Sequence, residues 1–287
     1  MNTKVCNFDI DQSIVAPITY RDYPHLTTSI GVEIGQKIRE ELSLLLAGFL
    51  KFHKREGKGT FIRVDAFLSE DGLNIIEFNV ELADGWGVAL NLARACGKPV
   101  ELPVGVELPR QYTAYKSDYL PEYRLAISEF GRLGQNSMSI KEDFWTPEVK
   151  DPLDSKLCLE QFARTWSGNT VRIPKLYSVE TTLWESLPEN VVFKFTEKYG
   201  PEALRARYSV APRDKIGKGK HVRQSYNASK AVAQERITPH TLPDGSVTQA
   251  IIMCAGSTPI TGYLQVASQG EFIINDRTGR KGPLLFV

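Results

Sequence analysis

Residues 61–80, FIRVDAFLSEDGLNIIEFNV, place charged and amide side chains inside two runs that otherwise have the composition of buried β-strands. In both runs apolar and polar residues alternate, which is typical of strands with one buried face. The segment SEDGLN between them contains the Asp-Gly pair that favours a tight hairpin turn. The sequence therefore predicts an antiparallel hairpin, and we expect a three-residue loop that ends with Gly72 in the left-handed conformation.

This hairpin would oppose two carboxylates. With the expected loop, Asp65 lies directly across from Glu77, and Arg63 lies across from Asn79. Like charges so placed destabilise a sheet, but a bound divalent cation would reverse the sign of their interaction. Carboxylate and amide oxygens are hard ligands that suit Mg²⁺. Two alternatives remain open: the carboxylates face solvent from a half-exposed sheet, or a one-residue change in register separates them.

The bulk properties of the chain exclude several classes of protein. Its 287 residues, 42% hydrophobic and 24% charged, are typical of a soluble globular protein with one or two domains. A net charge of +1 provides no general attraction to nucleic acid or anionic membranes. The N-terminus lacks a signal-peptide pattern, and no apolar run approaches the roughly 20 residues that span a bilayer. We therefore expect a cytoplasmic protein that does not interact with membranes.

Metal-ligand spacing is absent from the cysteines and histidines. The four cysteines are far apart and include no C-x-x-C pair, and the four histidines form no cluster. This pattern gives no support to a zinc site or a thioredoxin-type redox site.

Helices and strands are mixed along the chain, which indicates an α/β or α+β fold. Apolar residues with helical spacing predict a packing helix within residues 27–59, terminated by the glycines at its end. Shorter helices are expected within residues 85–97 and 154–166. Strands are expected at residues 189–198, 247–254, 260–267 and 271–275.

The segment RVDAFLSEDGLNIIEFNVELADG resembles the metal-binding hairpin of ATP-grasp enzymes, which contains R-x-D, then D-G, then E-x-N. The resemblance implies that Asp65, Glu77 and Asn79 hold one or two Mg²⁺ ions on ATP. It also implies a catalytic role for Arg63 beside them.

Three further segments are similar to parts of the same family. In DSKLCLEQ, Lys156 matches a nucleotide-binding lysine at the start of a helix. In VVFKF, Lys194 matches the strand lysine that touches phosphate and takes part in catalysis. The segment VAQERI resembles the adenine hinge, which implies that Gln234, Glu235 and Ile237 lie against the base and ribose.

The order of these segments resembles the circularly permuted ATP-grasp group, which includes glutathionylspermidine-synthetase-like ligases, because the hairpin precedes the lysines and the hinge. The resemblance implies an α+β fold of two lobes, built from mixed and antiparallel sheets with packing helices. Residues 1–150 would carry the metal-binding hairpin and the helical part of the central lobe, residues 151–235 the nucleotide lid, and residues 236–287 the C-terminal strands. The hairpin and the C-terminal strands should then share one sheet.

A basic stretch at residues 205–223 contains seven Lys and Arg residues and one acidic residue, Asp214. It is compatible with a solvated surface loop, or with a lid in which Lys218 and Lys220, beside glycines, grip phosphate. A nucleic-acid patch is the weaker third interpretation, because few aromatic residues accompany the charges.

The segment NDRTGRKG near the C-terminus offers two arginines, Arg277 and Arg280. In the permuted group an arginine lies near the nucleotide and the acyl substrate, so the resemblance implies a catalytic role for Arg277. Its bidentate fork could bind a carboxylate or a phosphate. A polar turn is the plainer interpretation of the same residues.

The resemblance implies an ATP- and Mg²⁺-dependent carboxylate–amine ligase that forms an amide or peptide bond through an acyl phosphate. Its substrates would be a small carboxylic acid and an amine, such as an amino acid or a polyamine. The alternatives are an ATP-grasp phosphotransferase (a kinase), a non-catalytic nucleotide sensor, or a basic-patch nucleic-acid binder. The sequence leaves open the identity of the substrates and the formation of homo-oligomers.

Overall fold

A computed structural model describes most of the chain and shows a mixed α+β fold. The described residues are 2–15, 26–55, 61–69, 72–80, 85–101, 153, 155–196, 221–267 and 279–287, with the backbone alone at 19–20, 23–24 and 220.

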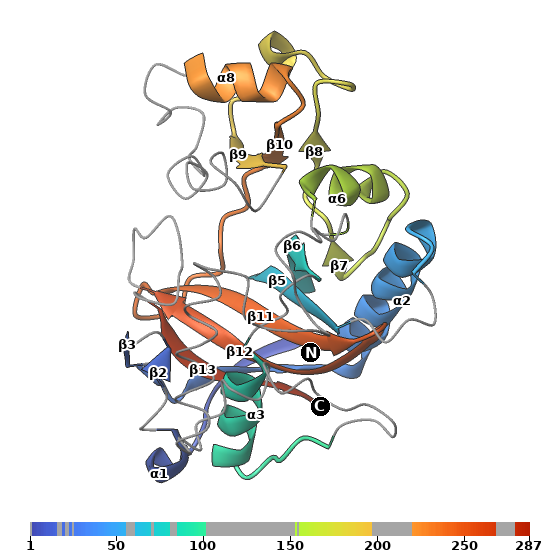
Figure 1. Ribbon diagram of the computed structural model, residues 1–287. Helices are drawn as coiled ribbons and strands as arrows, with labels where there is room; N and C mark the ends of the chain where they lie inside the picture. Colours follow the sequence, from blue (N-terminus) through green and yellow to red (C-terminus); the bar gives the residue numbers. More distant parts are fainter. Residues whose placement is uncertain are drawn as a thin grey trace, which may run out of the picture.

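An eight-stranded sheet forms the larger part of the molecule, with strand order β1-β4-β13-β12-β11-β5-β6-β7 (Figure 1). Neighbouring strands are antiparallel except for the pairs β13–β4 and β6–β7. The pairing of β5 with β11 confirms that the hairpin and the C-terminal strands share one sheet. The strands are β1 (Thr3–Asn7), β4 (Ile30–Ile34), β5 (Phe61–Ser69), β6 (Gly72–Asn79), β7 (Val171–Arg172), β11 (Val247–Ala255), β12 (Thr258–Ala267) and β13 (Arg280–Phe286).

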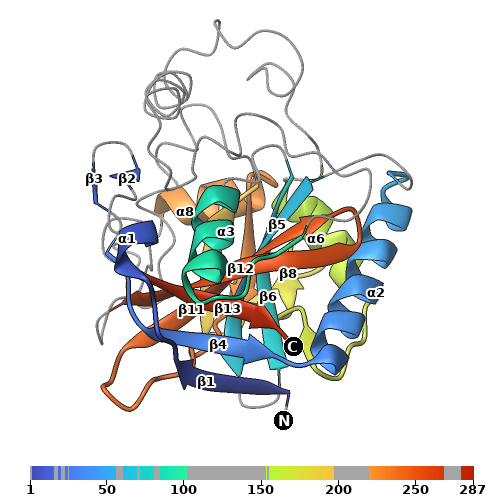
Figure 2. The ribbon, with the colours of Figure 1, turned by 90° about the horizontal axis from the view of Figure 1, so that it is seen from below.

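Helices cover both faces of the large sheet. The apolar side of α2 (Gln36–Phe52) packs into a core that includes Ile252 of β11. The preceding residue of β11 is Ile251, whose side chain points to the other face of the sheet. It belongs to a second core with α3 (Trp86–Ala95) and α1 (Gln12–Val15). Because side chains alternate along a strand, α2 and α3 lie on opposite faces. Figure 2 shows α3 in front of the strands.

A second sheet of three short antiparallel strands lies on the other side of α6 from the large sheet (Figure 1). It has the order β8-β10-β9, and one of its faces packs on α8 through Val222 and Tyr226, beside the short helix η2. Its other face packs on α6 through Val232 and Leu176. The elements are α6 (Lys156–Ala163), β8 (Leu176–Tyr177), η2 (Trp184–Ser186), β9 (Val191–Phe195), α8 (Lys220–Asn227) and β10 (Ala231–Glu235), while β2 (Thr19–Tyr20) and β3 (Tyr23–Pro24) form a separate ribbon.

The chain passes between the two sheets more than once. β7 belongs to residues 151–235, yet it pairs with β6 of the large sheet. Residues 236–246 then connect β10 of the small sheet to β11 of the large one. The small sheet is therefore joined to the large sheet through the segment between β7 and β8 and through residues 236–246.

Several expected elements are confirmed, and two differ. Strands occupy residues 191–195, 247–255 and 258–267, while the strand expected at 271–275 lies outside the described residues. The helix expected within residues 27–59 is preceded by strand β4, in which Val32 and Ile34 are buried, and the helix ends at Phe52. The polar turn expected to extend to residue 282 overlaps β13, because pairing with β12 and β4 overrides the local turn signal of Gly282 and Pro283.

Within the described part of the chain, the helices are all too short or too polar to cross a membrane.

Candidate functional site

The hairpin of β5 and β6 has the register that the sequence predicts at its charged residues. Asp65 pairs with Glu77, and Arg63 pairs with Asn79. The apolar residues of β5, Ile62, Val64 and Ala66, point into the core beneath α2. The four polar residues consequently lie on the opposite face of the sheet.

The expected turn of the hairpin is wrong. Ser69 pairs with Gly72, so two residues connect the strands, and Gly72 belongs to β6 without a left-handed conformation. A Cβ atom on Gly72 would lie 1.8 Å from the carbonyl oxygen of Thr170. Glycine is required here because the backbone preceding β7 approaches closely, a tertiary contact that the local sequence does not reveal.

A β-bulge at Ile76 restores the register that the shorter turn would otherwise shift. Ala66 pairs with Ile75 and Asp65 pairs with Glu77, so Ile76 has no residue opposite it. The bulge changes which alternate residues of β6 point into the core, and this directs Glu77 to the face that carries Asp65. The core residues are Leu73 and Ile75 before the bulge, and Phe78 and Val80 after it.

The same bulge contacts the small sheet. The Lys194 ammonium on β9 donates a hydrogen bond of 2.9 Å to the carbonyl oxygen of Ile76. Desolvation lowers the pKa of Lys194 to about 8, and this exceeds the opposing effects of Glu77 and Asp65, while Lys156 lowers the pKa further. Lys194 therefore lies within electrostatic reach of both carboxylates of the hairpin.

Lys156 forms the second connection between the hairpin and the elements that follow it. It is the first residue of α6, after Ser155, whose hydroxyl caps the helix by accepting from the N–H of Leu157. Its Nζ lies 2.7 Å from Oε1 of Glu77, and Lys156 itself is buried. A buried ammonium requires such a partner, because burial of an uncompensated charge is expensive.

Asp65 is surrounded by hydrogen-bond donors. Arg63 donates from Nε to Oδ1 at 2.8 Å and from Nη2 to Oδ2 at 3.2 Å. Asn79 donates to Oδ1 at 3.2 Å, and Gln249 donates to Oδ2 at 3.4 Å. Asp65 is only 6% exposed, which excludes the interpretation that this carboxylate faces solvent.

These contacts correct one step of the sequence argument. Asp65 has Arg63 as a counter-ion, and Glu77 has Lys156. Their charges are therefore balanced without a metal, and the opposition of two carboxylates does not by itself require one.

The donor chemistry nevertheless fits a magnesium ion. Asp65, Glu77 and Asn79 provide hard oxygen donors, which Mg²⁺ prefers. Asp65 and Glu77 are directly opposed, and Asn79 lies two residues after Glu77 on the same face of the hairpin. Groups of three or more His, Cys, Asp or Glu side chains that could hold a metal are absent from the described residues. The third donor here would be the amide of Asn79, whose placement beside Asp65 comes from the hairpin register.

β10 is the strand that resembles the adenine hinge. Val232 pairs with Lys194, and Gln234 pairs with Val192, so Gln234 and Lys194 project to the same face of the small sheet. Gln234 is buried, and its Nε2 has no hydrogen-bond partner in the described part of the structure. A buried amide without a partner is costly, so this atom is a candidate ligand-binding group.

The other two hinge residues are placed differently. Glu235 is exposed and next in the alternation, so it is directed away from the face of Gln234. Its carboxylate accepts from the N–H of Lys175 at 3.3 Å. Ile237 is half-buried and lies beyond the end of β10.

For the remaining predicted site residues, the described part of the structure shows no contact with the cluster around Asp65 and Glu77. Lys218 and Arg277 lie outside the described residues, and only the backbone of Lys220 is described, at the start of α8. Arg280 lies on β13, where Nη2 is 3.8 Å from Oδ2 of Asp244. The end of the basic stretch is helical, and its Arg223 pairs with Glu185 at the surface.

Sequence reasoning missed a polar row that continues from Asp65 across the sheet. Gln249 of β11 pairs with Gln265 of β12, which pairs with Lys281 of β13. All three are buried, and Lys281 lies 5.9 Å from the ring centroid of Tyr263. A polar residue within an apolar strand is the same signal that identified Asp65, and it was present in VTQAIIMCA.

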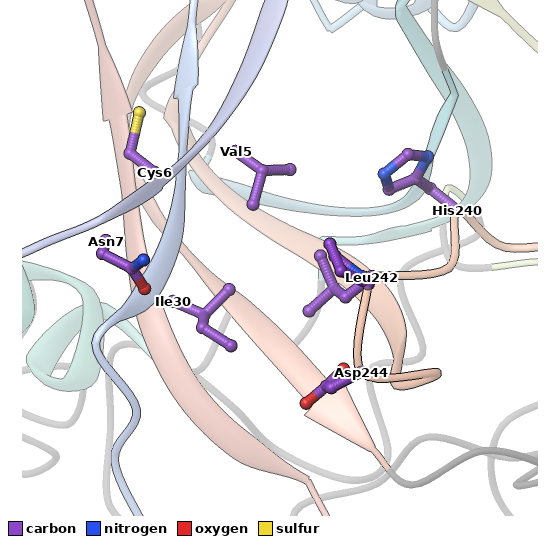
Figure 3. Close-up of a pocket in the computed structure, with 8 residues that line it drawn as sticks. Val5, Cys6, Asn7, Ile30, His240, Leu242 and Asp244 are labelled. Carbon is purple, nitrogen blue, oxygen red and sulfur yellow. The ribbon is translucent and has the colours of Figure 1, made fainter.

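A separate pocket of about 480 Å³ lies at the β1 end of the large sheet (Figure 3). Its walls come from β1, β4 and the connection around His240, and they include Cys6. Burial and the nearby Glu33 raise the pKa of the Cys6 thiol, so it is not an activated nucleophile. The lining residues of the pocket do not include Asp65, Glu77 or Asn79, so the pocket is not part of the cluster.

Comparison with protein-family models finds no match, and comparison with curated proteins finds none either.

Proposed function

We propose that this chain is an ATP- and Mg²⁺-dependent carboxylate–amine ligase with a circularly permuted ATP-grasp fold. The substrate carboxylate would attack the γ-phosphorus of ATP to form an acyl phosphate and ADP. An amine would then attack the acyl carbon and release phosphate, leaving an amide. This proposal begins from the resemblance of the hairpin and the lysine segments to that family.

The observation that carries the proposal is the meeting of two lysines with two carboxylates between the sheets. Lys156 comes from α6 and lies 2.7 Å from Glu77, while Lys194 comes from β9 and lies 2.9 Å from the carbonyl oxygen beside it. A magnesium–triphosphate complex needs carboxylates on the metal side and cations on the phosphate side. The hairpin, α6 and β9 would present these groups to one bound nucleotide.

The small sheet also supports a place for the base. Val192, Val232 and Gln234 share the face that carries Lys194. Val232 is packed in the core with α6, so the unpartnered amide of Gln234, with Val192 beside it, is the part of this face that we assign to the base. An adenine needs flat apolar contact together with a few polar groups that fix its orientation. The base would therefore lie along β10, with the phosphates directed toward Lys194.

Asp65, Glu77 and Asn79 would hold the magnesium, which when bound supplies charge neutralisation on the phosphate oxygens. Lys194 and Lys156 would bind the phosphates and stabilise the charge that develops during transfer. Arg63, next to Asp65, would contact the transferring phosphoryl group through its guanidinium. Gln249 would keep Asp65 oriented from the neighbouring strand.

The first test is calorimetric titration of ATP into the purified protein, with Mg²⁺ and then with excess chelator. Binding that depends on Mg²⁺ is expected. Release of ADP is then screened with acids and amines in pairs, including amino acids and polyamines, and hydroxylamine is added to trap an acyl phosphate as a hydroxamate.

The outcomes separate the alternatives. A ligase requires both substrates and releases inorganic phosphate, whereas a kinase produces a phosphorylated acid and needs no amine. Binding without turnover across the panel would favour a nucleotide sensor. Absence of nucleotide binding under both conditions would reject the proposal.

A further inference from the structure

Arg63 occupies both oxygens of the Asp65 carboxylate. Its Nε and Nη2 donate to Oδ1 and Oδ2 at 2.8 and 3.2 Å, which is the bidentate fork of a strong charge-assisted pair. Both residues lie on one strand and one face, at positions i and i+2, so the pair needs no other element to form. The fork therefore persists whenever β5 is folded and nothing competes for Asp65.

Glu77 is occupied from a different direction. Lys156 reaches it from the start of α6, with Nζ 2.7 Å from Oε1. The side chain of Lys156 is 8% exposed and that of Glu77 is 23% exposed, so the contact is shielded from solvent on the lysine side. Each proposed carboxylate ligand thus already has a cation of its own.

A divalent cation cannot simply join this arrangement. Mg²⁺ requires near-ideal octahedral geometry and direct access to carboxylate lone pairs, and the fork of Arg63 lies on both oxygens of Asp65. A metal bound to those oxygens would also be repelled by the adjacent guanidinium and by the ammonium of Lys156. A metal that binds without nucleotide must therefore displace Arg63 and Lys156 and leave both of these side chains without a counter-ion.

A nucleotide changes this balance. Its phosphates carry several negative charges and accept hydrogen bonds from guanidinium and ammonium groups as well as carboxylates do. Arg63 and Lys156 could then exchange carboxylate for phosphate without losing a counter-ion. The metal would take their place on Asp65 and Glu77.

We propose that Arg63 and Lys156 act as internal counter-ions that keep the metal ligands occupied until a nucleotide arrives, so that metal binds well only together with nucleotide. This inference rests on the proposed function for the identity of the nucleotide site. It adds that the two cations exclude free metal in the absence of nucleotide.

The test measures Mn²⁺ binding without nucleotide, by following the electron paramagnetic resonance signal of free Mn²⁺ during titration. Wild type is expected to bind Mn²⁺ weakly. Arg63→Met removes the fork and should bind Mn²⁺ about tenfold more tightly, because a positive charge next to the metal is lost. Lys156→Met should also bind more tightly, through the release of Glu77.

Arg94→Met is the matched control, because Arg94 is an exposed arginine on α3 and its loss changes the net charge equally. It should leave Mn²⁺ affinity unchanged. Arg63→Lys keeps the charge but cannot form the fork, so its affinity should lie between those of wild type and Arg63→Met. Circular dichroism melting confirms that each variant is folded, and Lys156→Met carries the test if Arg63→Met is not.

Failure of this inference is distinguishable from failure of the proposed function. If wild type binds ATP with Mg²⁺ but the Arg63 and Lys156 variants bind Mn²⁺ no more tightly than wild type, the counter-ion inference is overturned and the ligase proposal stands. If the variants gain Mn²⁺ affinity but wild type binds no nucleotide, the exclusion of free metal by the two cations stands, while the exchange with nucleotide and the proposed function both fail.

Discussion

The hairpin and the small sheet hold their charged residues in different ways. Asp65 is fixed by donors from its own strand and from both neighbouring strands, β6 and β11, inside an eight-stranded sheet. Lys194 lies on a three-stranded sheet and reaches across to the backbone of β6 through a long flexible side chain. The carboxylates thus lie on the large sheet, whose neighbouring strands hold them in place. The lysines reach them from α6 and from the small sheet.

In the proposed function, this difference would allow a phosphate site to be assembled from two parts. Oxygen ligands for a metal need fixed geometry, which a wide sheet provides. Cations that grip phosphates need only approach closely, and lysine suits this because it acts as a point charge. Substitutions in the hairpin and substitutions of the lysines should therefore change nucleotide binding in different ways and by different amounts.

The largest effect is expected from Glu77→Gln. The substitution keeps the shape of the side chain but removes the charge that faces Lys156 and the proposed metal. Affinity for Mg²⁺-ATP should fall by about 100-fold or more, because loss of outer-shell groups alone costs up to that much in metal sites. Calorimetry measures the affinity, and thermal melting checks that the fold is intact.

Glu185→Gln is the control for this variant, since it removes an exposed carboxylate that pairs with Arg223 on the surface of the small-sheet region. It should bind nucleotide normally. Wild-type affinity in Glu77→Gln would show that the hairpin is not the metal site.

Lys194→Met should lower affinity for ATP by about tenfold or more, because a charge-assisted hydrogen bond contributes about 1.5–3 kcal/mol. The loss should be seen for ATP and ADP but be small for adenosine, which has no phosphate. The exposed Lys230, after α8, serves as the matched control. An equal loss for adenosine would contradict a phosphate role for Lys194.

Ser155→Ala removes the cap of α6 and should lower the free energy of unfolding by about 1 kcal/mol. Because Ser155 positions the helix that begins with Lys156, nucleotide affinity should also decrease slightly, while the large sheet stays folded. Urea denaturation followed by fluorescence measures the stability. A global loss well above this size would show that α6 supports the large sheet as well as the small sheet.

The pH dependence should be the smallest effect. The pKa of Lys194 is lowered to about 8, so its ammonium loses its proton as the pH rises through that value. If only the charged form grips phosphate, affinity for ATP should fall about fourfold between roughly pH 7 and pH 8.5, as the charged fraction falls. The Lys194→Met variant should lack this dependence, and a dependence that survives in it would belong to another group.

The effect of pH on stability has the opposite sign to its effect on ATP affinity. Between about pH 8 and the usual lysine pKa of 10.5, the unfolded chain binds more protons at this residue than the folded protein. The contribution of Lys194 to the free energy of unfolding should therefore rise with pH in that window.

The hairpin illustrates how far local patterns reach. Alternation along FIRVDAFLS and GLNIIEFN predicted both strands, and the pairing of Asp65 with Glu77 is confirmed. The route to that pairing was wrong, because a shorter turn and a bulge at Ile76 compensate for each other. A bulge inserts a single residue into the alternation, and a pattern with period two does not reveal it.

Strand β4 and Gln249 illustrate what was missed. IGVEI was absorbed into the apolar spacing of the following helix, although its burial comes from pairing with β1 and β13. Gln249 carried the same signal as Asp65 but gained meaning only when β11 was paired beside β5. Strand partners that are distant in the chain are set by global packing, which local propensity does not encode.

By itself, the sequence determined the strands of the hairpin, the packing helix and the polar positions that interrupt apolar runs, because these depend on side-chain periodicity over a few residues. Only the tertiary structure decided which partners those polar residues have. Lys194 and its acceptor Ile76 are 118 residues apart in the chain, and Glu77 meets Lys156 only because α6 lies against β6. Ion pairs act over a few ångströms, so they follow from how the two sheets pack around α6.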